Sequence, residues 1–260
     1  MRSMDNPGAN GVSLFVLAHQ DDELCAAPIV ASRKAKGRPV CVVYLTDGEA
    51  GGVSAQRRNR ESGNALAMLG AAPSELVFLG SVRGFPDGKL HTVLPDALGS
   101  LEETVRAAGG VDEIFTLAYE GGHQDHDACH AAAVVLASRL GLLARTRQIP
   151  FYRKAGSVPG IAVLAPLAEN GAATPWPLSA GERIRMLSLM RMYPSQWRVL
   201  LGLGPLLAAA CAVRPGLPVQ PVAMKRLRER PTAAPMFYER RQKVDAAEVT
   251  GAIARLAELA

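Results

Sequence analysis

The chain has 260 residues, of which 48% are hydrophobic and 20% charged, and its formal net charge is +5. This composition excludes a disordered chain, and the length suits one α/β domain with an appended segment better than two independent domains. The four cysteines show no paired spacing, and the polar first eleven residues lack the apolar core of a signal peptide. We therefore expect a cytoplasmic protein with reduced cysteines.

Short apolar runs predict strands at residues 12–18, 39–45, 75–79, 111–117, 148–153 and 161–164. Helices are expected between them at 20–36, 55–70, 93–108 and 126–139. Strands separated by helices pair in parallel through right-handed crossovers. The expected fold class is therefore α/β: a Rossmann-like, mostly parallel sheet with helices on both faces, followed by a C-terminal helical and basic segment. We divide the chain into a tail (1–11), an α/β core (12–170) and a segment that completes the fold (171–260).

Two clusters of histidines and carboxylates follow predicted strands. Residues 18–23 read Ala-His-Gln-Asp-Asp-Glu, and residues 123–126 read His-Gln-Asp-His. The carboxyl ends of parallel strands meet at one edge of an open α/β sheet, where ligands bind. Three of the five histidines of the chain lie in these clusters, although a single histidine or an acidic helix start is usually structural. Their conjunction indicates a metal site.

A catalytic zinc site takes three His, Asp or Glu ligands and leaves one position open for water. Two clusters can supply the ligands: His19, Asp22 and His126. Asp21 then stays unligated beside the bound water, whose pKa zinc lowers to about 7, and can accept its proton. His123 can stabilise the oxyanion of an attacked carbonyl, and Asp125 can hold a histidine in place. Such a ligand set does not separate Zn²⁺ sharply from Fe²⁺ or Co²⁺.

The two clusters resemble the signature blocks of the PIG-L/LmbE family of zinc-dependent de-N-acetylases, with Gln20 and Gln124 where the family usually has proline. The glycine-rich turn at 45–51, the loop at 85–88 and the Tyr-Pro-Ser-Gln run at 193–196 are also similar to family elements. The resemblance is strong over residues 12–140. It implies a metal-dependent hydrolase that removes the N-acetyl group from an N-acetylglucosamine-type conjugate.

The resemblance also implies a role for each residue of the clusters. The metal ligands would be His19, Asp22 and His126, as ligand chemistry alone suggests. Asp21 would be the general base, and His123 the electrostatic stabiliser or general acid, oriented by Asp125.

Three further polar residues are candidates for contacts to the substrate: Asp47, Arg58 and Asp87. Asp47 and Asp87 each precede a glycine and are equally explained as turn residues. Arg58 lies in a run of arginines that can also form a solvated helix face.

Other functions remain open at this stage. The same site suits an amidase that cleaves a larger amide conjugate. A magnesium phosphatase or a receiver domain needs no histidine ligands, so His123 and His126 argue against both. A non-catalytic metal-binding module has no use for Asp21, which no structural zinc site requires.

The last third of the chain is basic. Residues 182–243 contain twelve Lys or Arg against three Glu, a balance of +9. Such a block favours an anionic partner: a phosphate-bearing glycoconjugate, a membrane surface or nucleic acid, and no motif supports the last.

The apolar run at 199–213 lies inside this block. It is shorter than the ~20 residues of a transmembrane helix. We expect a buried helix or a homo-oligomer interface. The alternative is an apolar lip, flanked by Arg198 and Arg214, that accommodates a lipid-linked aglycone through peripheral membrane contact.

Overall fold

The computed structural model describes residues 11–155, 160–241 and 244–260. Lys243 and all of the expected tail except Gly11 lie outside the described residues. A seven-stranded sheet runs in the order β3-β2-β1-β4-β5-β9-β8, and β6 and β7 pair in a separate hairpin. The strands are β1 Ser13–Leu17, β2 Val40–Tyr44, β3 Leu76–Val77, β4 Glu113–Leu117, β5 Thr146–Ile149, β6 Tyr152–Lys154, β7 Ile161–Val163, β8 Thr174–Pro177 and β9 Gly216–Pro221.

The five strands from β3 to β5 pair in parallel, whereas β9 and β8 add to the sheet in antiparallel fashion. This confirms the α/β class with a mostly parallel sheet. The single strand predicted at 148–153 is wrong: Pro150, which has no N–H to donate, lies where β5 ends, and β6 belongs to the hairpin. The strand predicted at 75–79 is reduced to two residues, because the short helix α3 begins at Leu79.

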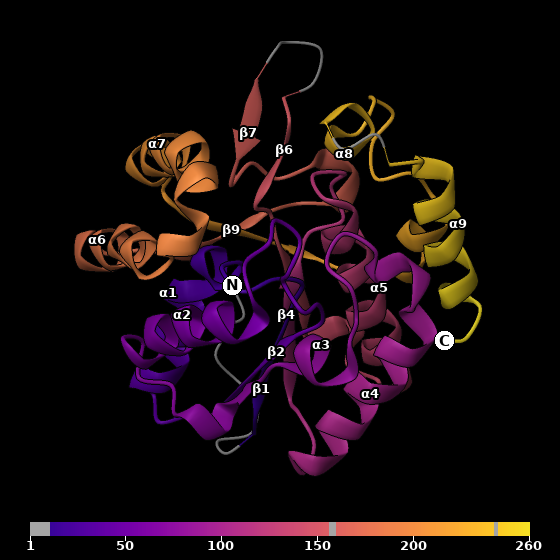
Figure 1. Ribbon diagram of the computed structural model, residues 1–260, viewed down its shortest axis with the longest axis horizontal. Helices are drawn as coiled ribbons and strands as arrows, with labels where there is room; N and C mark the ends of the chain where they lie inside the picture. Colours follow the sequence, from indigo (N-terminus) through magenta and orange to yellow (C-terminus); the bar gives the residue numbers. More distant parts are fainter. Residues whose placement is uncertain (1–10, 156–159, 242–243) are drawn as a thin grey trace.

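Helices cover both faces of the sheet. They are α1 Glu23–Ala35, α2 Ala55–Ala67, α3 Leu79–Arg83, α4 Leu94–Ala107, α5 Gln124–Arg139, α6 Ala180–Leu189, α7 Trp197–Val213, α8 Phe237–Arg241 and α9 Ala246–Ala257. In Figure 1, α1, α2 and α6 lie on one side of the sheet, and α4, α5 and α9 on the other. Ser54 caps α2, since its side chain accepts a hydrogen bond from the N–H of Arg57.

The core lies around β1, β2 and β4, in which every residue is buried. Helix α5 is buried over most of its length, and its alanines allow it to approach the sheet closely. Two buried polar groups at the start of β1 and β4 satisfy each other, because the Ser13 hydroxyl donates to Glu113 Oε1 at 2.6 Å. The four cysteines, all within the described ranges, are buried and free. This core fixes the carboxyl ends of β1 and β4 side by side.

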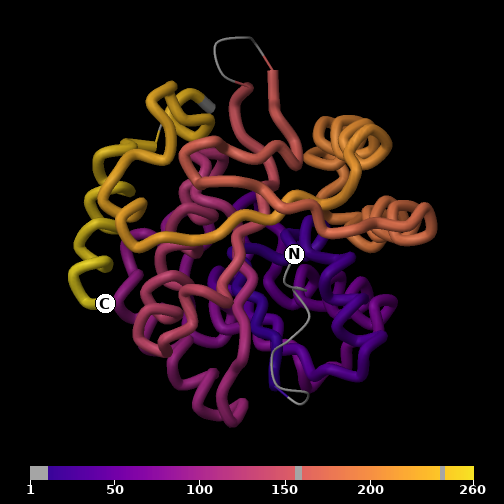
Figure 2. The backbone as a smooth tube through the Cα atoms, turned by 180° about the vertical axis from the view of Figure 1, so that it is seen from behind, coloured from indigo at the N-terminus to yellow at the C-terminus, as the bar shows by residue number. Residues whose placement is uncertain are grey.

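Helices α6 and α7 lie beside each other outside the sheet, and the chain then crosses behind the molecule through β9 toward α9 (Figure 2). The prediction of a buried helix at 199–213 is wrong, because only Gly204, Leu207 and Cys211 of α7 are buried. By length and composition alone, residues Pro194–Val213 are also long and apolar enough to cross a membrane. The other faces of α7 therefore contact solvent or a partner.

Candidate active site

A cavity of about 290 Å³ opens beyond the carboxyl ends of β1 and β4. This is the edge of the sheet at which the two sequence clusters were expected to meet. Its wall contains most of the predicted site residues: His19, Asp21, Asp22, Arg58, Asp87, His123 and His126.

The turn between β1 and α1 has a conformation that its sequence does not suggest. The carboxylate of Asp22 folds back onto the chain and accepts hydrogen bonds from the N–H groups of Ala18 and His19 at 3.1 and 2.7 Å. Asp21 takes a φ of 136°, which costs a non-glycine residue free energy and is typical of functional sites. Helix α1 therefore begins at Glu23 rather than at Gln20, and its first turn carries one carboxylate instead of three.

Three histidines from the two clusters converge on one point. One ring nitrogen each of His19, His123 and His126 can be chosen so that all lie within 4.8 Å of one another. Asp22 lies between two of them, with Oδ2 at 3.4 Å from His19 Nδ1 and Oδ1 at 3.1 Å from His126 Nε2. A carboxylate oxygen and an imidazole lone pair repel each other unless a proton or a metal ion lies between them. Burial and donor type thus fit a metal site of nitrogen and oxygen ligands.

Asp125 holds His19 from the opposite side. Its Oδ2 accepts a hydrogen bond from His19 Nε2 at 3.1 Å, which leaves Nδ1 of the ring free to face Asp22. Its two oxygens also accept hydrogen bonds from the backbone N–H groups of Gly88, at 2.5 Å, and Leu90, at 3.0 Å. A second group of three residues, His19, Asp87 and Asp125, also lies within metal-binding distance. Because both oxygens of Asp125 are engaged by backbone donors, this carboxylate suits the support of a ligand better than ligation.

His123 is the N-cap of α5, and its Nδ1 accepts a hydrogen bond from the backbone N–H of Asp125 at 3.2 Å. The carboxylate of Asp125 contacts His19, so its link to the His123 ring runs through this N–H. Burial, together with the charge of His19, lowers the pKa of His123 to about 3, although the Asp125 carboxylate opposes the shift. The ring is therefore neutral at neutral pH and carries its proton on Nε2, as a hydrogen-bond donor.

Asp21 and Arg58 form an ion pair at the cavity wall. Arg58 Nη2 lies 3.3 Å from Asp21 Oδ1, and the same guanidinium donates to the carbonyl oxygens of Gln20 and Gly48 at 2.5 and 3.1 Å. Burial raises the pKa of Asp21 to about 7, even though the Arg58 charge lowers it. For Asp22, burial is outweighed by His126 and His19, which hold its pKa well below the usual range. The adjacent carboxylates thus differ in proton affinity, as a base and a ligand do.

The comparisons with known proteins agree with this geometry. Residues 14–137 match the family model described as GlcNAc-PI de-N-acetylase, PIG-L. We refer to residues 14–137, the segment that this family model matches, as the PIG-L domain. It contains both clusters and most of the parallel sheet, so the resemblance seen in the sequence is confirmed for this part of the chain.

Relatives of the PIG-L domain were found among curated proteins and solved structures. The uncharacterized deacetylase YaiS of Escherichia coli (strain K12) is 31% identical over 127 residues, which are 47% of this chain and 65% of that protein. The structure of the A40926 pseudoaglycone deacetylase Dbv21 has a TM-score of 0.59 at 20% identity, and the match covers 86% of this chain and 99% of the Dbv21 chain. The structure of the N,N'-diacetylchitobiose deacetylase from Pyrococcus horikoshii has a TM-score of 0.50 at 17% identity, and the match covers 81% of this chain and 84% of that chain. At these identities the solved structures support the fold alone.

Two of the three predicted substrate contacts of the PIG-L domain lie on the cavity wall. Asp87 Oδ1 is 3.2 Å from His19 Nε2, and Asp87 also faces Arg58 at 3.8 Å. Asp47 lies outside the lining that the described residues form. Its Oδ1 accepts the N–H groups of Glu49 and Asp87 at 3.1 and 3.0 Å, so its observed contacts are those of a turn residue that joins two loops.

The sequence predicted no role for four further residues of the cavity wall: Leu24, Ala50, Phe151 and Tyr152. The wall also contains Gln196, Val199, Leu200 and Leu203, of which the last three lie in the apolar run at 199–213 that was alternatively predicted to form an apolar lip. Tyr152 stands edge-on to the His126 ring with centroids 5.4 Å apart. Leu200 and Leu203 come from α7, outside the PIG-L domain. The similarity of 193–196 to a family element was the one available signal for Gln196.

Proposed function

We propose that this protein is a metal-dependent hydrolase that removes the N-acetyl group from an amino-sugar conjugate. The observation that carries the proposal is that four side chains line one cavity: Asp21, which has a φ of 136°, and the contacting group of His19, Asp22 and His126. The relatives described above are named as deacetylases, and one is named for a chitobiose substrate, which supports an N-acetylated sugar.

The ligands we assign to the metal are His19, Asp22 and His126. Zn²⁺ is our first choice, with Fe²⁺ or Co²⁺ as alternatives. When bound there, a divalent metal lowers the pKa of water and polarises the carbonyl oxygen. Asp125 holds His19 in the orientation that this role requires, through the Nε2 hydrogen bond of 3.1 Å.

Asp21 acts as the general base in this proposal. Its carboxylate accepts a proton from the attacking water as the water oxygen bonds to the carbonyl carbon of the acetamide. Arg58 holds the carboxylate in the cavity at 3.3 Å. A base whose pKa lies near the working pH is efficient, and burial moves the pKa of Asp21 in that direction.

His123 stabilises the negative charge that develops on the carbonyl oxygen. Its neutral ring offers Nε2–H as a donor, because Nδ1 is occupied by the N–H of Asp125. When the C–N bond breaks, the amine nitrogen takes the proton held by Asp21, and acetate leaves. Water is consumed, and one amine and one acetate are formed.

The test is release of a free amine from a panel of N-acetylglucosamine conjugates: the free sugar and its nucleotide-linked, inositol-linked, lipid-linked and aminoglycoside-type forms. Metal-loaded wild type is expected to release amine and acetate in equal amounts, and Asp21→Asn serves as the blank. Amine accompanied by an acid larger than acetate would identify an amidase of larger conjugates instead. No amine from any conjugate by metal-loaded protein would contradict the proposal.

A further inference from the structure

The helix pair α6–α7 exposes an unusual share of large apolar side chains. Of ten such exposed residues in the described part of the chain, six lie between 184 and 213: Ile184, Trp197, Val199, Leu201, Leu206 and Val213. Leu201 and Ile184 are each 67% exposed, and Val213 is 81% exposed. Scattered exposed apolar residues are normal, but a contiguous set marks an interaction surface. We call the exposed side of residues 180–213 the α6–α7 face.

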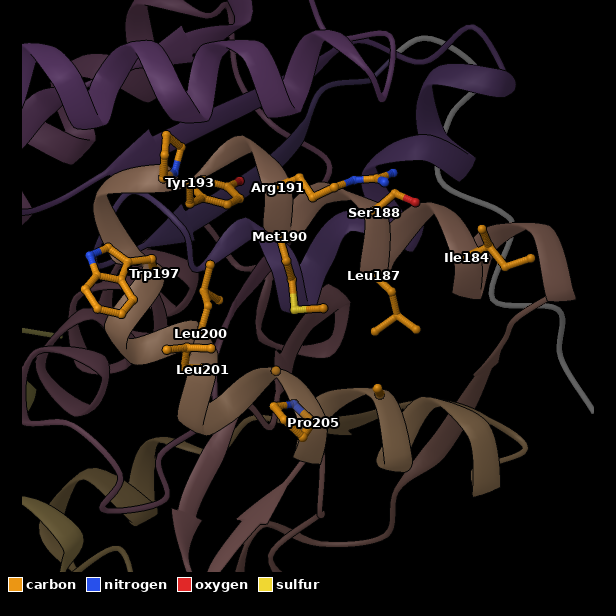
Figure 3. Close-up of a pocket in the computed structure, with 13 residues that line it drawn as sticks. Ile184, Leu187, Ser188, Met190, Arg191, Tyr193, Trp197, Leu200, Leu201 and Pro205 are labelled. Carbon is orange, nitrogen blue, oxygen red and sulfur yellow. The ribbon is translucent and has the colours of Figure 1, made fainter.

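An apolar groove of about 790 Å³ runs along this face. In Figure 3, Leu187 and Met190 extend toward the helix that carries Leu201 and Pro205, and Trp197 stands at one end of the groove. Leu200 lines both this groove and the catalytic cavity. One side of α7 is therefore the wall of the active site, and the neighbouring side is open to an apolar partner.

The rim of the face is positively charged. Arg185, Arg191 and Arg198 are exposed, and Glu182 is the sole acidic residue in the sequence between positions 179 and 214. The carboxylate of Glu182 is engaged by the N–H and hydroxyl of Ser179 in a capping box. Basic and aromatic residues around an apolar surface are the pattern of proteins that lie in the interface of an anionic membrane.

We propose that the α6–α7 face docks on an anionic phospholipid bilayer, with its apolar side chains among the acyl chains and its arginines at the phosphates. If the proposed function holds, docking brings the catalytic cavity to the membrane surface, where a lipid-linked N-acetyl sugar is presented. The helix lies in the plane of the interface rather than across the bilayer, because Gly204, Leu207 and Cys211 stay buried in the protein.

A second copy of the chain is a poorer occupant of this face. A two-fold symmetric contact would place this basic patch against the same basic patch of the other copy. With one acidic residue against five arginines in residues 180–214, the like charges would repel. A surface of lipid phosphates matches this charge.

The experiment is sedimentation of the full chain with phosphatidylcholine vesicles, pure or mixed with one part phosphatidylglycerol to two parts phosphatidylcholine. We expect wild type to bind the mixed vesicles and to be released by salt. Leu201→Glu should lower the partition roughly tenfold, since it removes one buried leucine from the contact. Arg191→Gln/Arg198→Gln should lower the partition roughly 25-fold, at about fivefold per arginine. A blue shift of tryptophan emission on binding should disappear in Trp197→Phe, because Trp176 is buried.

Matched controls separate this contact from a change in charge or in folding. Val82→Glu alters a side chain that is 79% exposed on α3, and Arg106→Gln/Arg145→Gln removes two exposed charges elsewhere. Both should bind vesicles like wild type, and so should Asp21→Asn, because binding is measured without substrate. The proposal is overturned if wild type stays in the supernatant at low salt or if Val82→Glu loses as much binding as Leu201→Glu. A dimer that Leu201→Glu dissociates and that ignores vesicles would also overturn it.

Discussion

The carboxylate of Glu61 on α2 accepts hydrogen bonds from both the backbone N–H, at 3.1 Å, and the hydroxyl of Ser195, which lies 134 residues further along the chain. Glu61 is buried. Gln196, which follows Ser195 in the chain, lines the cavity of the candidate site. This contact joins the PIG-L domain to the start of α7. Glu61 is therefore a positioning residue for the part of the wall that the C-terminal segment provides.

Loss of this contact should weaken substrate binding more than chemistry. We expect Glu61→Ala to raise KM roughly tenfold with a smaller change in kcat, because Gln196 and α7 lose their attachment while Asp21 is untouched. Steady-state kinetics on the best conjugate of the panel measure the split. Arg57→Gln removes the exposed partner of Glu61 on the same helix and should have little effect. Equal losses in kcat for both variants would contradict the positioning role.

Asp21→Asn should retain the metal and lose kcat by roughly 10²–10⁴-fold, the usual contribution of a general base. The amide keeps the size of the side chain but cannot accept the proton of the attacking water. Metal content and amine release are measured on the same preparation. Normal turnover by this variant would show that another group is the base.

The ligand set can be read from two histidine variants. His126→Ala should lose the metal, because it removes a proposed ligand opposite Asp22. His123→Ala should keep the metal and lose kcat by roughly 10²–10³-fold, the usual effect of removing an oxyanion donor. Metal stoichiometry after gel filtration decides between them. If His123→Ala also lost the metal, the three-histidine group, which lies within the same 4.8 Å, would be the ligand set.

The stability of the protein should fall with rising pH because of Glu120. Burial raises the pKa of this carboxyl from 4.5 to about 8, although the N–H of Phe151 and the charge of Arg153 lower it. Its contribution is thus fully present below pH 4.5 and is lost as the pH rises toward 8, since the unfolded chain ionises first. In wild type the free energy of unfolding should fall by on the order of a few kcal/mol over this pH range because of Glu120. Glu120→Gln should not show this fall. Urea titrations at pH 5 and 8.5 measure it, and Glu258→Gln at the exposed end of α9 should leave the decrease unchanged.

Gly122 has no room for a side chain. A Cβ at this position would lie 1.9 Å from the carbonyl oxygen of Tyr152, so the backbone just before His123 must move. Gly122→Ala should therefore lower Tm by several degrees and reduce kcat. Gly63→Ala, in the middle of α2 with nothing within 4 Å, should instead raise stability by about 0.5–1 kcal/mol. Thermal unfolding of the two variants against wild type tests both signs.

The parallel part of the fold could be predicted because each element carries a local signal. Buried apolar runs mark β1, β2 and β4, and Ser54 marks the start of α2. The antiparallel strands β8 and β9 were missed because their prolines resemble loops, and their pairing is set by contacts distant in sequence. The helix start at Gln20 was predicted because three carboxylates suit a helix N-terminus. The Asp22 carboxylate instead accepts hydrogen bonds from the N–H groups of Ala18 and His19, which holds this segment in a turn.

The candidate site was predictable to the extent that it lies in two short clusters. Their meeting follows from the parallel pairing of β1 and β4. The contribution of α7 was predicted only as the alternative of an apolar lip at 199–213, since in the sequence Leu200 and Leu203 differ in no visible way from core leucines. The three ligands, the base and the division of the chain at residue 170 stay predictions, which the variants above address. Cytoplasmic location likewise stays a prediction.

The pairing of Pro177 with Gly216 has a consequence for how this protein can change. These residues end β8 and begin β9, so the chain leaves the sheet and re-enters it at the same place. Helices α6 and α7 are therefore an insertion in a hairpin, and their replacement by another helix pair leaves every strand pairing intact. Since α7 also forms one wall of the cavity, we expect such an exchange to alter substrate preference and the proposed membrane contact together, without changing the residues proposed for the chemistry. Chimeras built at these two positions are a direct route to new specificities.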